Sequence, residues 1–132
     1  MRVTLSSGTP AALAKAGGEP IMGLVIATDI FGLRPLFDDM VDAIAAEQQM
    51  TVCAPEPFPG QELPFEVEAR YRAVGQLRDA DVLRDLVEAA DATGCDRVST
   101  QRGVIITGRR DTRWRSISKD ALPSPMIIAA RT

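Results

Sequence analysis

Three side chains stand out as candidates for nucleophilic or acid–base chemistry: the carboxyl group of Asp29 and the thiols of Cys53 and Cys95. Asp29 opens the segment Asp29–Gly32, which lies between an apolar run and a helical pattern. That position is the carboxyl end of a predicted strand, where open α/β sheets bind their ligands. The spacing therefore makes Asp29–Gly32 the first candidate for a functional loop.

Two features of a common type of nucleophilic site, in which a histidine activates a thiol or hydroxyl, are missing from the sequence. The chain contains no histidine, so no imidazole can deprotonate a nucleophile and later protonate the leaving group. It also contains no G-x-C-x-G or G-x-S-x-G sequence, the signature of the strand-to-helix turn that exposes a nucleophile. The catalytic set is therefore incomplete.

Neither thiol has the sequence context of a reactive group. Cys53 falls in a predicted buried strand, where cysteine usually packs as a small hydrophobe. Cys95 follows Gly94 in a predicted turn; Arg97 could activate it, but an inert surface thiol is the simpler interpretation. The two cysteines lack C-x-x-C spacing, so we expect neither a zinc site nor a disulfide framework, and no cofactor.

The elements that position the loop form a βαβ unit, which implies a parallel sheet. Ile21–Thr28 is nearly all apolar, as expected of a strand that is covered on both faces. Arg34–Gln48 has the apolar periodicity of a helix, and Met50–Ala54 reads as the next strand. Four prolines and Gly60 then exclude regular structure as far as Pro64.

The rest of the chain predicts further elements around this unit. They are a short edge strand at Val3–Leu5, an exposed flexible turn at Gly8–Pro20, helices at Phe65–Gln76 and Asp79–Thr93 with Gly94 as the cap of the second, and strands at Arg97–Ser99 and Gly103–Gly108. No run of 18 apolar residues occurs, and the N-terminal segment lacks the apolar core of a signal peptide, so we expect a cytoplasmic protein.

The charge changes sign along the chain. Residues 1–96 hold 7 Lys/Arg and 16 Asp/Glu, a net charge of −9, whereas residues 97–132 hold 8 and 2, a net charge of +6. A basic cluster of Arg109, Arg110, Arg113, Trp114 and Arg115 could contact phosphates and stack on a base. A solvated or disordered tail is the favoured interpretation. The nearby GVIITGRR segment lacks the lysine of a phosphate-binding loop.

Five features along the chain resemble the dienelactone hydrolase family of the α/β-hydrolase superfamily. They are the apolar strand Leu24–Thr28, the acidic-Ile-Phe-Gly-Leu loop Asp29–Leu33, the helix Arg34–Gln48, the strand and Pro-rich turn Thr51–Phe58, and the helix and turn of Asp79–Val98. The resemblance implies that Asp29 matches the family's acidic residue near the nucleophile thiol and that the backbone N–H of Ile30 matches an oxyanion-hole donor. Asp29 could instead be only a hydrogen-bonding loop residue.

The resemblance implies an α/β fold with a partial α/β-hydrolase-like parallel sheet flanked by helices over residues 1–98. Residues 99–132 then form a basic segment that we expect to be less ordered. The family hydrolyses small carboxylic esters or lactones with a Cys–Asp–His triad and no metal. We therefore expect a hydrolase that is truncated before its nucleophile elbow and inactive alone, and we favour a reading-frame change near residue 99 as the cause. The unpaired sheet edge would favour self-association.

Two other classes of function stay open at this point. One is a non-catalytic interaction module whose basic C-terminal segment binds an acidic partner or nucleic acid. The other is a small-molecule binder that uses the Asp29–Gly32 loop without catalysis. The salt dependence of polyanion binding would separate the first class from a hydrolase remnant.

Overall fold

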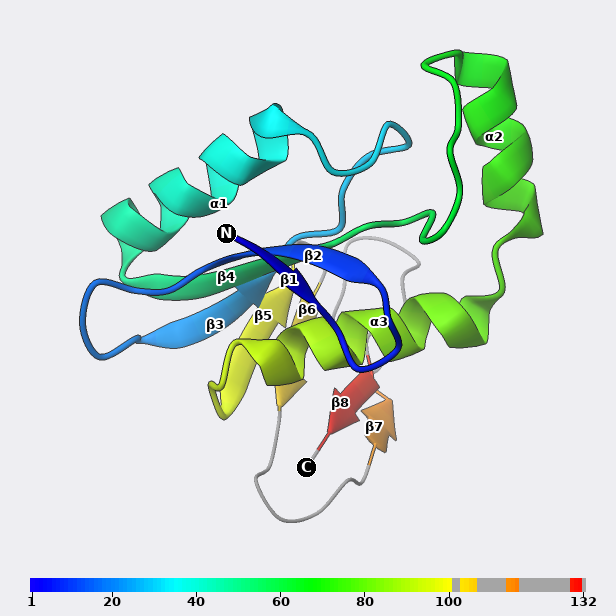
Figure 1. Cartoon of the computed structure of the whole chain (residues 1–132). Helices are drawn as coiled ribbons and strands as arrows, with labels where there is room; N and C mark the ends of the chain where they lie inside the picture. The colour runs from blue at the N-terminus through cyan, green and yellow to red at the C-terminus, as the bar shows by residue number, and fades with distance from the viewer. Residues whose placement is uncertain (101–102, 107–113, 117–128, 132) are drawn as a thin grey trace.

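The computed structural model describes residues 1–100, 103–106, 114–116 and 129–131 (Figure 1). Its strands are β1 (Arg2–Thr4), β2 (Pro10–Ala14), β3 (Met22–Val25), β4 (Met50–Pro55), β5 (Arg97–Thr100), β6 (Gly103–Ile106), β7 (Trp114–Ser116) and β8 (Ala129–Arg131). Its helices are α1 (Pro35–Gln48), α2 (Val67–Gln76) and α3 (Asp79–Ala92). Among the described residues, no helix has the length and apolar character needed to cross a membrane.

One six-stranded sheet forms the centre of the fold, with the order β1-β2-β4-β3-β5-β6. Strands β4, β3 and β5 are mutually parallel, whereas β1, β2 and β6 add antiparallel pairings at the two sides. The predicted α/β fold is confirmed, and the sheet is mixed, with its parallel part at the centre. A separate two-stranded sheet pairs β7 with β8.

Helices α1 and α3 cover opposite faces of the sheet, which gives three layers (Figure 1). The cluster under α3 contains Leu5, Ala11, Leu13, Val25, Cys53, Leu86, Ala89, Ala90 and Val98. The cluster under α1 contains Ala12, Ala14, Ile26, Phe37, Val41, Ala45, Val52 and Ala54. Successive residues of β2 alternate between the two clusters, because neighbouring side chains on a strand point to opposite faces.

The prediction of an exposed turn over Gly8–Pro20 is wrong. Pro10–Ala14 is a strand with four buried residues, and it pairs with β1 on one side and β4 on the other. Alanine and proline are poor strand formers, so local preference gave no signal for this element. Tertiary packing stabilises this strand, because its side chains pack under α3 on one face of the sheet and under α1 on the other.

The other predicted elements are present with modest changes in length. Seven elements lie within their predicted segments or extend them by one residue: helices α1, α2 and α3 and strands β1, β4, β5 and β6. The strand expected over Ile21–Thr28 is shorter, since β3 ends at Val25 and the chain continues as a loop. Gly94 has a φ of 68°, the left-handed conformation expected of the residue that ends a helix.

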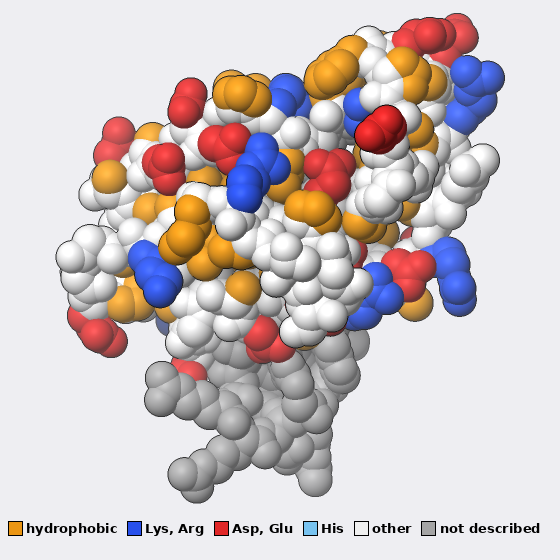
Figure 2. Space-filling view, viewed as in Figure 1, with side chains coloured by type: hydrophobic (Ala, Val, Ile, Leu, Met, Phe, Trp, Pro, Cys, Tyr) orange, Lys and Arg blue, Asp and Glu red, His pale blue; other side chains and the backbone are white. Residues whose placement is uncertain are grey.

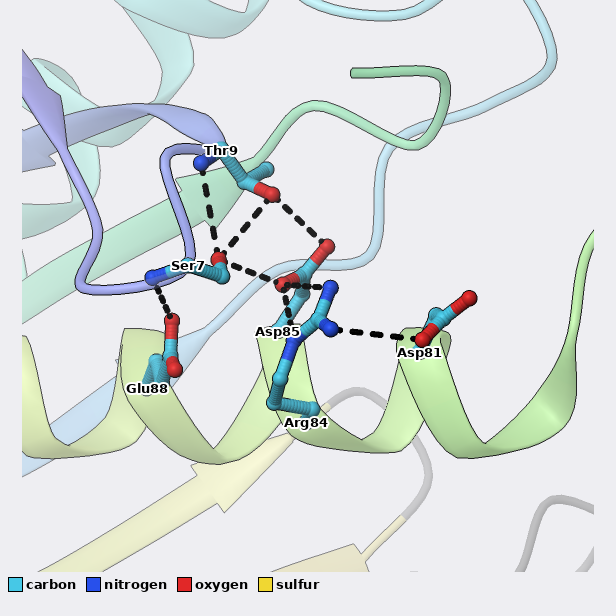
Figure 3. Close-up of polar contacts among 6 residues, drawn as sticks. All are labelled: Ser7, Thr9, Asp81, Arg84, Asp85 and Glu88. Atoms are coloured by element: carbon cyan, nitrogen blue, oxygen red, sulfur yellow. Dashed lines mark hydrogen bonds and ion pairs between the residues drawn. The ribbon is translucent and has the colours of Figure 1, made fainter.

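A buried carboxylate holds the β1–β2 hairpin against α3 (Figure 3). The hydroxyl groups of Ser7 and Thr9 donate to the two carboxylate oxygens of Asp85 over 2.8 and 2.9 Å. The side chain of Arg84 donates to the same carboxylate, and the backbone N–H of Ser7 donates to Glu88. We call these residues the hairpin network; they satisfy a carboxylate that is only 7% exposed.

Candidate functional site

The loops after β3 and β4 leave the sheet at the same edge, because the two strands are parallel. Val25 is paired with Cys53 of β4 and with Thr100 of β5, so all three central strands point their carboxyl ends to this edge. The loop after β3 contains Asp29–Gly32, and Glu56 directly follows β4. The structure therefore places the candidate loop at the edge expected for ligand binding in an open α/β sheet.

Residues 29–32 form a tight turn closed by their own hydrogen bonds. The backbone N–H of Gly32 donates to the carbonyl oxygen of Asp29 over 3.0 Å, and the N–H of Phe31 donates to Oδ1 of Asp29 over the same distance. Asp at the first position of a turn commonly makes this second bond. Within the described part of the chain, no acceptor receives the N–H of Ile30.

Arg34 fixes the carboxylate of Asp29. Its Nη1 and Nη2 donate to Oδ1 and Oδ2 of Asp29 over 2.7 and 2.8 Å, a two-point contact between a planar guanidinium and a carboxylate. Nη1 also donates to the carbonyl oxygen of Gly32 over 3.1 Å. The hydrogen bonds from Arg34 lower the pKa of Asp29, partly opposed by desolvation, so the carboxyl group is ionised at neutral pH.

Glu56 joins the loop after β4 to the loop after β3. Its Oε2 accepts from the backbone N–H of Leu33 over 2.8 Å, and its Oε1 accepts from the N–H of Phe58 over 3.3 Å. The carboxylate occupies the space beside Gly32, where a Cβ atom would lie 2.5 Å from Oε1. Gly32 also has a φ of 74°, which side-chain-bearing residues rarely adopt. The positive φ therefore favours glycine there, and a side chain would also displace the Glu56 carboxylate from its hydrogen bonds.

Arg70 ties the start of α2 to the same loops. This side chain is only 6% exposed, and it donates to the carbonyl oxygens of Leu63, Pro64 and Ile30 over 2.6, 2.8 and 3.5 Å. Its guanidinium lies over the ring of Phe65, which stacks on Phe31 with ring centres 5.9 Å apart. The carbonyl side of Ile30 is thus held in place while its N–H stays open.

Neither thiol reaches this loop. Cys53 is fully buried within β4, and desolvation raises its pKa to about 12, so it remains a protonated thiol at neutral pH. Cys95 precedes the amino end of β5, at the opposite edge of the sheet from Asp29, and its Sγ lies 3.6 Å from the carbonyl oxygen of Thr93. The burial of Cys53 agrees with the expectation that this residue packs as a small hydrophobe.

Other candidate features lie elsewhere. Outside the described residues lie Gly108 and the Arg109–Arg115 cluster, of which only the backbone of β7 is described. Most of the segment after residue 100, which we expected to be less ordered, also lies outside them. Among the described residues, no group of three or more carboxylate or thiol side chains could hold a metal ion.

Sequence reasoning placed Asp29 and Ile30 but missed the three side chains that fix them. Glu56 could have been found, because it follows a strand predicted to lie beside β3 and to run parallel to it. Arg34 is five residues from Asp29, and helix periodicity alone does not show that it turns back to the loop. Arg70 gave no signal, since it reads as an ordinary charged residue of a helix.

The arrangement can present one backbone N–H to a ligand from a rigid loop. Such a donor stabilises an oxyanion when it is held at the place where negative charge develops. It accelerates acyl transfer only if a nucleophile attacks a carbonyl carbon whose oxygen lies within hydrogen-bond reach of the donor. The described residues provide the donor, its support and the ionised carboxylate of Asp29, but neither a thiol nor an imidazole beside it.

Comparison with known proteins confirms the resemblance noted in the sequence. No known protein-family profile matches the chain. A protein of Azospirillum brasilense described as a carboxymethylenebutenolidase, another name for a dienelactone hydrolase, is 30% identical over 105 residues. That match covers 72% of this chain and 45% of the relative.

The fold is also similar to part of a solved structure. The crystal structure of a protein from Klebsiella pneumoniae subsp. pneumoniae, described as a dienelactone hydrolase, matches with a TM-score of 0.65 and 22% identity. It covers 76% of this chain and 47% of the other. The chain thus shares part of the α/β-hydrolase fold and resembles dienelactone hydrolases, and it spans less than half the length of either protein.

Proposed function

We propose that residues 29–33 are the oxyanion loop of a dienelactone hydrolase-like site for small carboxylic esters or lactones. The observation that carries the proposal is the Ile30 N–H: no described residue accepts from it, although the turn around it is closed at Asp29, Gly32 and Leu33. This donor lies at the edge where all three parallel strands end. Asp29 acts as the acidic residue of that site and is kept ionised by Arg34.

In this proposal the 132 residues provide only the first part of the site and do not hydrolyse esters alone. The family's triad needs a thiol in an exposed elbow, a histidine and an aspartate; this chain has no elbow sequence and no histidine. Cys53 cannot replace that thiol, because burial keeps it protonated. In this proposal residues 1–98 form the hydrolase-like part, and a change of reading frame produces residues 99–132. A cytoplasmic location remains a prediction.

The direct test is turnover of an activated aryl ester by the purified chain, compared with Cys53→Ala and Cys95→Ala. We expect the same buffer-level rate for all three proteins, because no thiol lies beside the loop. Turnover that disappears in one variant alone would identify a working nucleophile and overturn the proposal of an inactive site.

The coding DNA around residue 99 tests the proposed truncation separately. A shift of one or two bases should reveal a downstream G-x-C-x-G sequence and a histidine codon. If neither alternative frame encodes that elbow, the truncation account is wrong, whereas the assignment of the Ile30 N–H is unaffected.

A further inference from the structure

Helix α2 carries an apolar stripe on its exposed surface. Val67, Tyr71 and Val74 follow one another at i, i+4 and i+7, so they share one side of the helix, and they are 49%, 63% and 41% exposed. Phe65, just before the helix, is 72% exposed. These apolar side chains lie together on and beside one short helix, whereas exposed apolar residues on an ordinary surface are scattered singly.

The stripe is not the side by which α2 is attached to the protein. Figure 1 shows α2 away from the sheet and the other two helices, at the end of a long connection from β4. The buried residues of α2 are Arg70 and Ala73, and Arg70 makes the hydrogen bonds to the neighbouring loops. The anchoring side is therefore already occupied, and the stripe beside it is open.

Charges along α2 have opposite signs at its two ends. Glu66 and Glu68 lie at the amino end, and Arg72 and Arg78 lie towards and beyond the carboxyl end; all four are exposed. None of the four makes an ion pair with a described residue. Figure 2 shows hydrophobic side chains among acidic and basic ones at the end of the molecule that holds α2.

We propose that α2 binds α2 of a second copy of this chain, antiparallel and related by a two-fold axis near Tyr71. This pairing sets Val67 of each copy against Val74 of the other and brings the two Tyr71 rings together. It also places Glu68 of each copy near Arg72 of the other. Glu68 and Arg72 lie on the same flank of the stripe, and the antiparallel pair sets these flanks together, so their opposite charges favour this dimer.

The size of the helix predicts a weak, reversible dimer. Ten residues of helix are about 15 Å long, so the pair buries well below the roughly 1,600 Å² of a standard interface. We therefore expect the dimer to form over a range from roughly ten micromolar to millimolar. This surface differs from the sheet edge that the sequence suggested, and it does not depend on the proposed hydrolase site.

Charge reversal gives the most specific test of this dimer. The full chain is studied by analytical ultracentrifugation from about 10 µM to about 1 mM, together with Glu68→Arg and Arg72→Glu. Each single variant should dimerise about tenfold more weakly, because both symmetric contacts become repulsive. An equimolar mixture of the two variants should associate about as well as the unmodified chain, since opposite charges then face each other again.

A stripe variant and a matched surface variant complete the test. Tyr71→Glu should weaken the dimer at least tenfold, whereas Ile21→Glu, at an exposed apolar residue outside α2, should leave it unchanged. Circular dichroism and thermal unfolding check that each variant is folded. A chain that stays monomeric at about 1 mM overturns the proposal. So does association that is insensitive to Tyr71→Glu, or a mixture of the charge variants that associates no better than either alone.

Discussion

Two aspartates in this molecule make comparable numbers of hydrogen bonds and have opposite surroundings. Asp85 is 7% exposed, and Ser7, Thr9 and Arg84 donate to it, so it closes the contact between the first hairpin and α3 (Figure 3). The side chain of Asp29 is 46% exposed, and Arg34 and the Phe31 N–H donate to it at an open edge of the sheet.

The difference separates a carboxylate that stabilises the fold from one that shapes a site. Without Asp85 the buried hydroxyl group of Thr9 would lose its acceptor, and the hydroxyl group of Ser7 would keep only Thr9 Oγ1. Around Asp29 the hydrogen bonds fix a turn and leave one backbone N–H available. Burial thus predicts where a substitution costs stability, and the open N–H predicts where a ligand could bind.

The largest effect on stability is expected at the loop itself, from Gly32→Val. The new side chain would meet the Glu56 carboxylate and force a branched residue into a positive φ, so the free energy of unfolding should fall by about 3 kcal/mol. Urea unfolding measures the loss. Gly75→Ala is the matched control: nothing surrounds its Cβ position, and it should be neutral or stabilise α2 by up to about 1 kcal/mol. Equal effects in the two variants would contradict the described packing.

Asp85→Ala should cost somewhat less, about 2 kcal/mol, because it removes a buried acceptor from two hydroxyl groups. A double-mutant cycle with Thr9→Val isolates the contact between the two side chains. The cost of Asp85→Ala should be clearly smaller in the Thr9→Val background. Strict additivity would show that the hairpin is held by its apolar residues and not by this network.

Asp29→Asn should have the smallest effect, within about 1 kcal/mol at neutral pH, because ion pairs at exposed sites contribute little. Arg34 lowers the pKa of Asp29 in the folded state, so the contribution of Asp29 is present above its unfolded pKa and is lost as the pH falls through its folded pKa. The difference in stability between the two proteins should therefore shrink in acid. A difference that grows as the pH falls below 4 has the wrong sign for this account.

Much of the fold could be predicted because its signals are local. Pro35 and the Phe37 and Val41 periodicity mark α1, and the short apolar run of β4 between Gln49 and a proline-rich loop marks a strand. Strand β2 could not be predicted, because its PAALA sequence has no strand preference. The strand forms through its pairing with β1 and β4.

The candidate site also has a part that the sequence predicts and a part that it does not. The position of Asp29 followed from the order of strand, loop and helix. The position of Glu56 could have followed from the predicted neighbouring strand, whereas that of Arg70 could not, because it reaches the Ile30 carbonyl from 40 residues further along the chain. Contacts of that kind depend on how the elements pack, and no local pattern in the sequence encodes them.

The central claim is that the loop holds the Ile30 N–H free while it fixes the groups around it. Amide hydrogen exchange, followed residue by residue by NMR, measures this directly. We expect fast exchange at Ile30 and at least tenfold slower exchange at Gly32 and Leu33, whose N–H groups donate to Asp29 and Glu56. Protection at Ile30 equal to that at Gly32 and Leu33 would mean that an internal acceptor occupies the N–H, and the oxyanion-loop assignment would then be wrong.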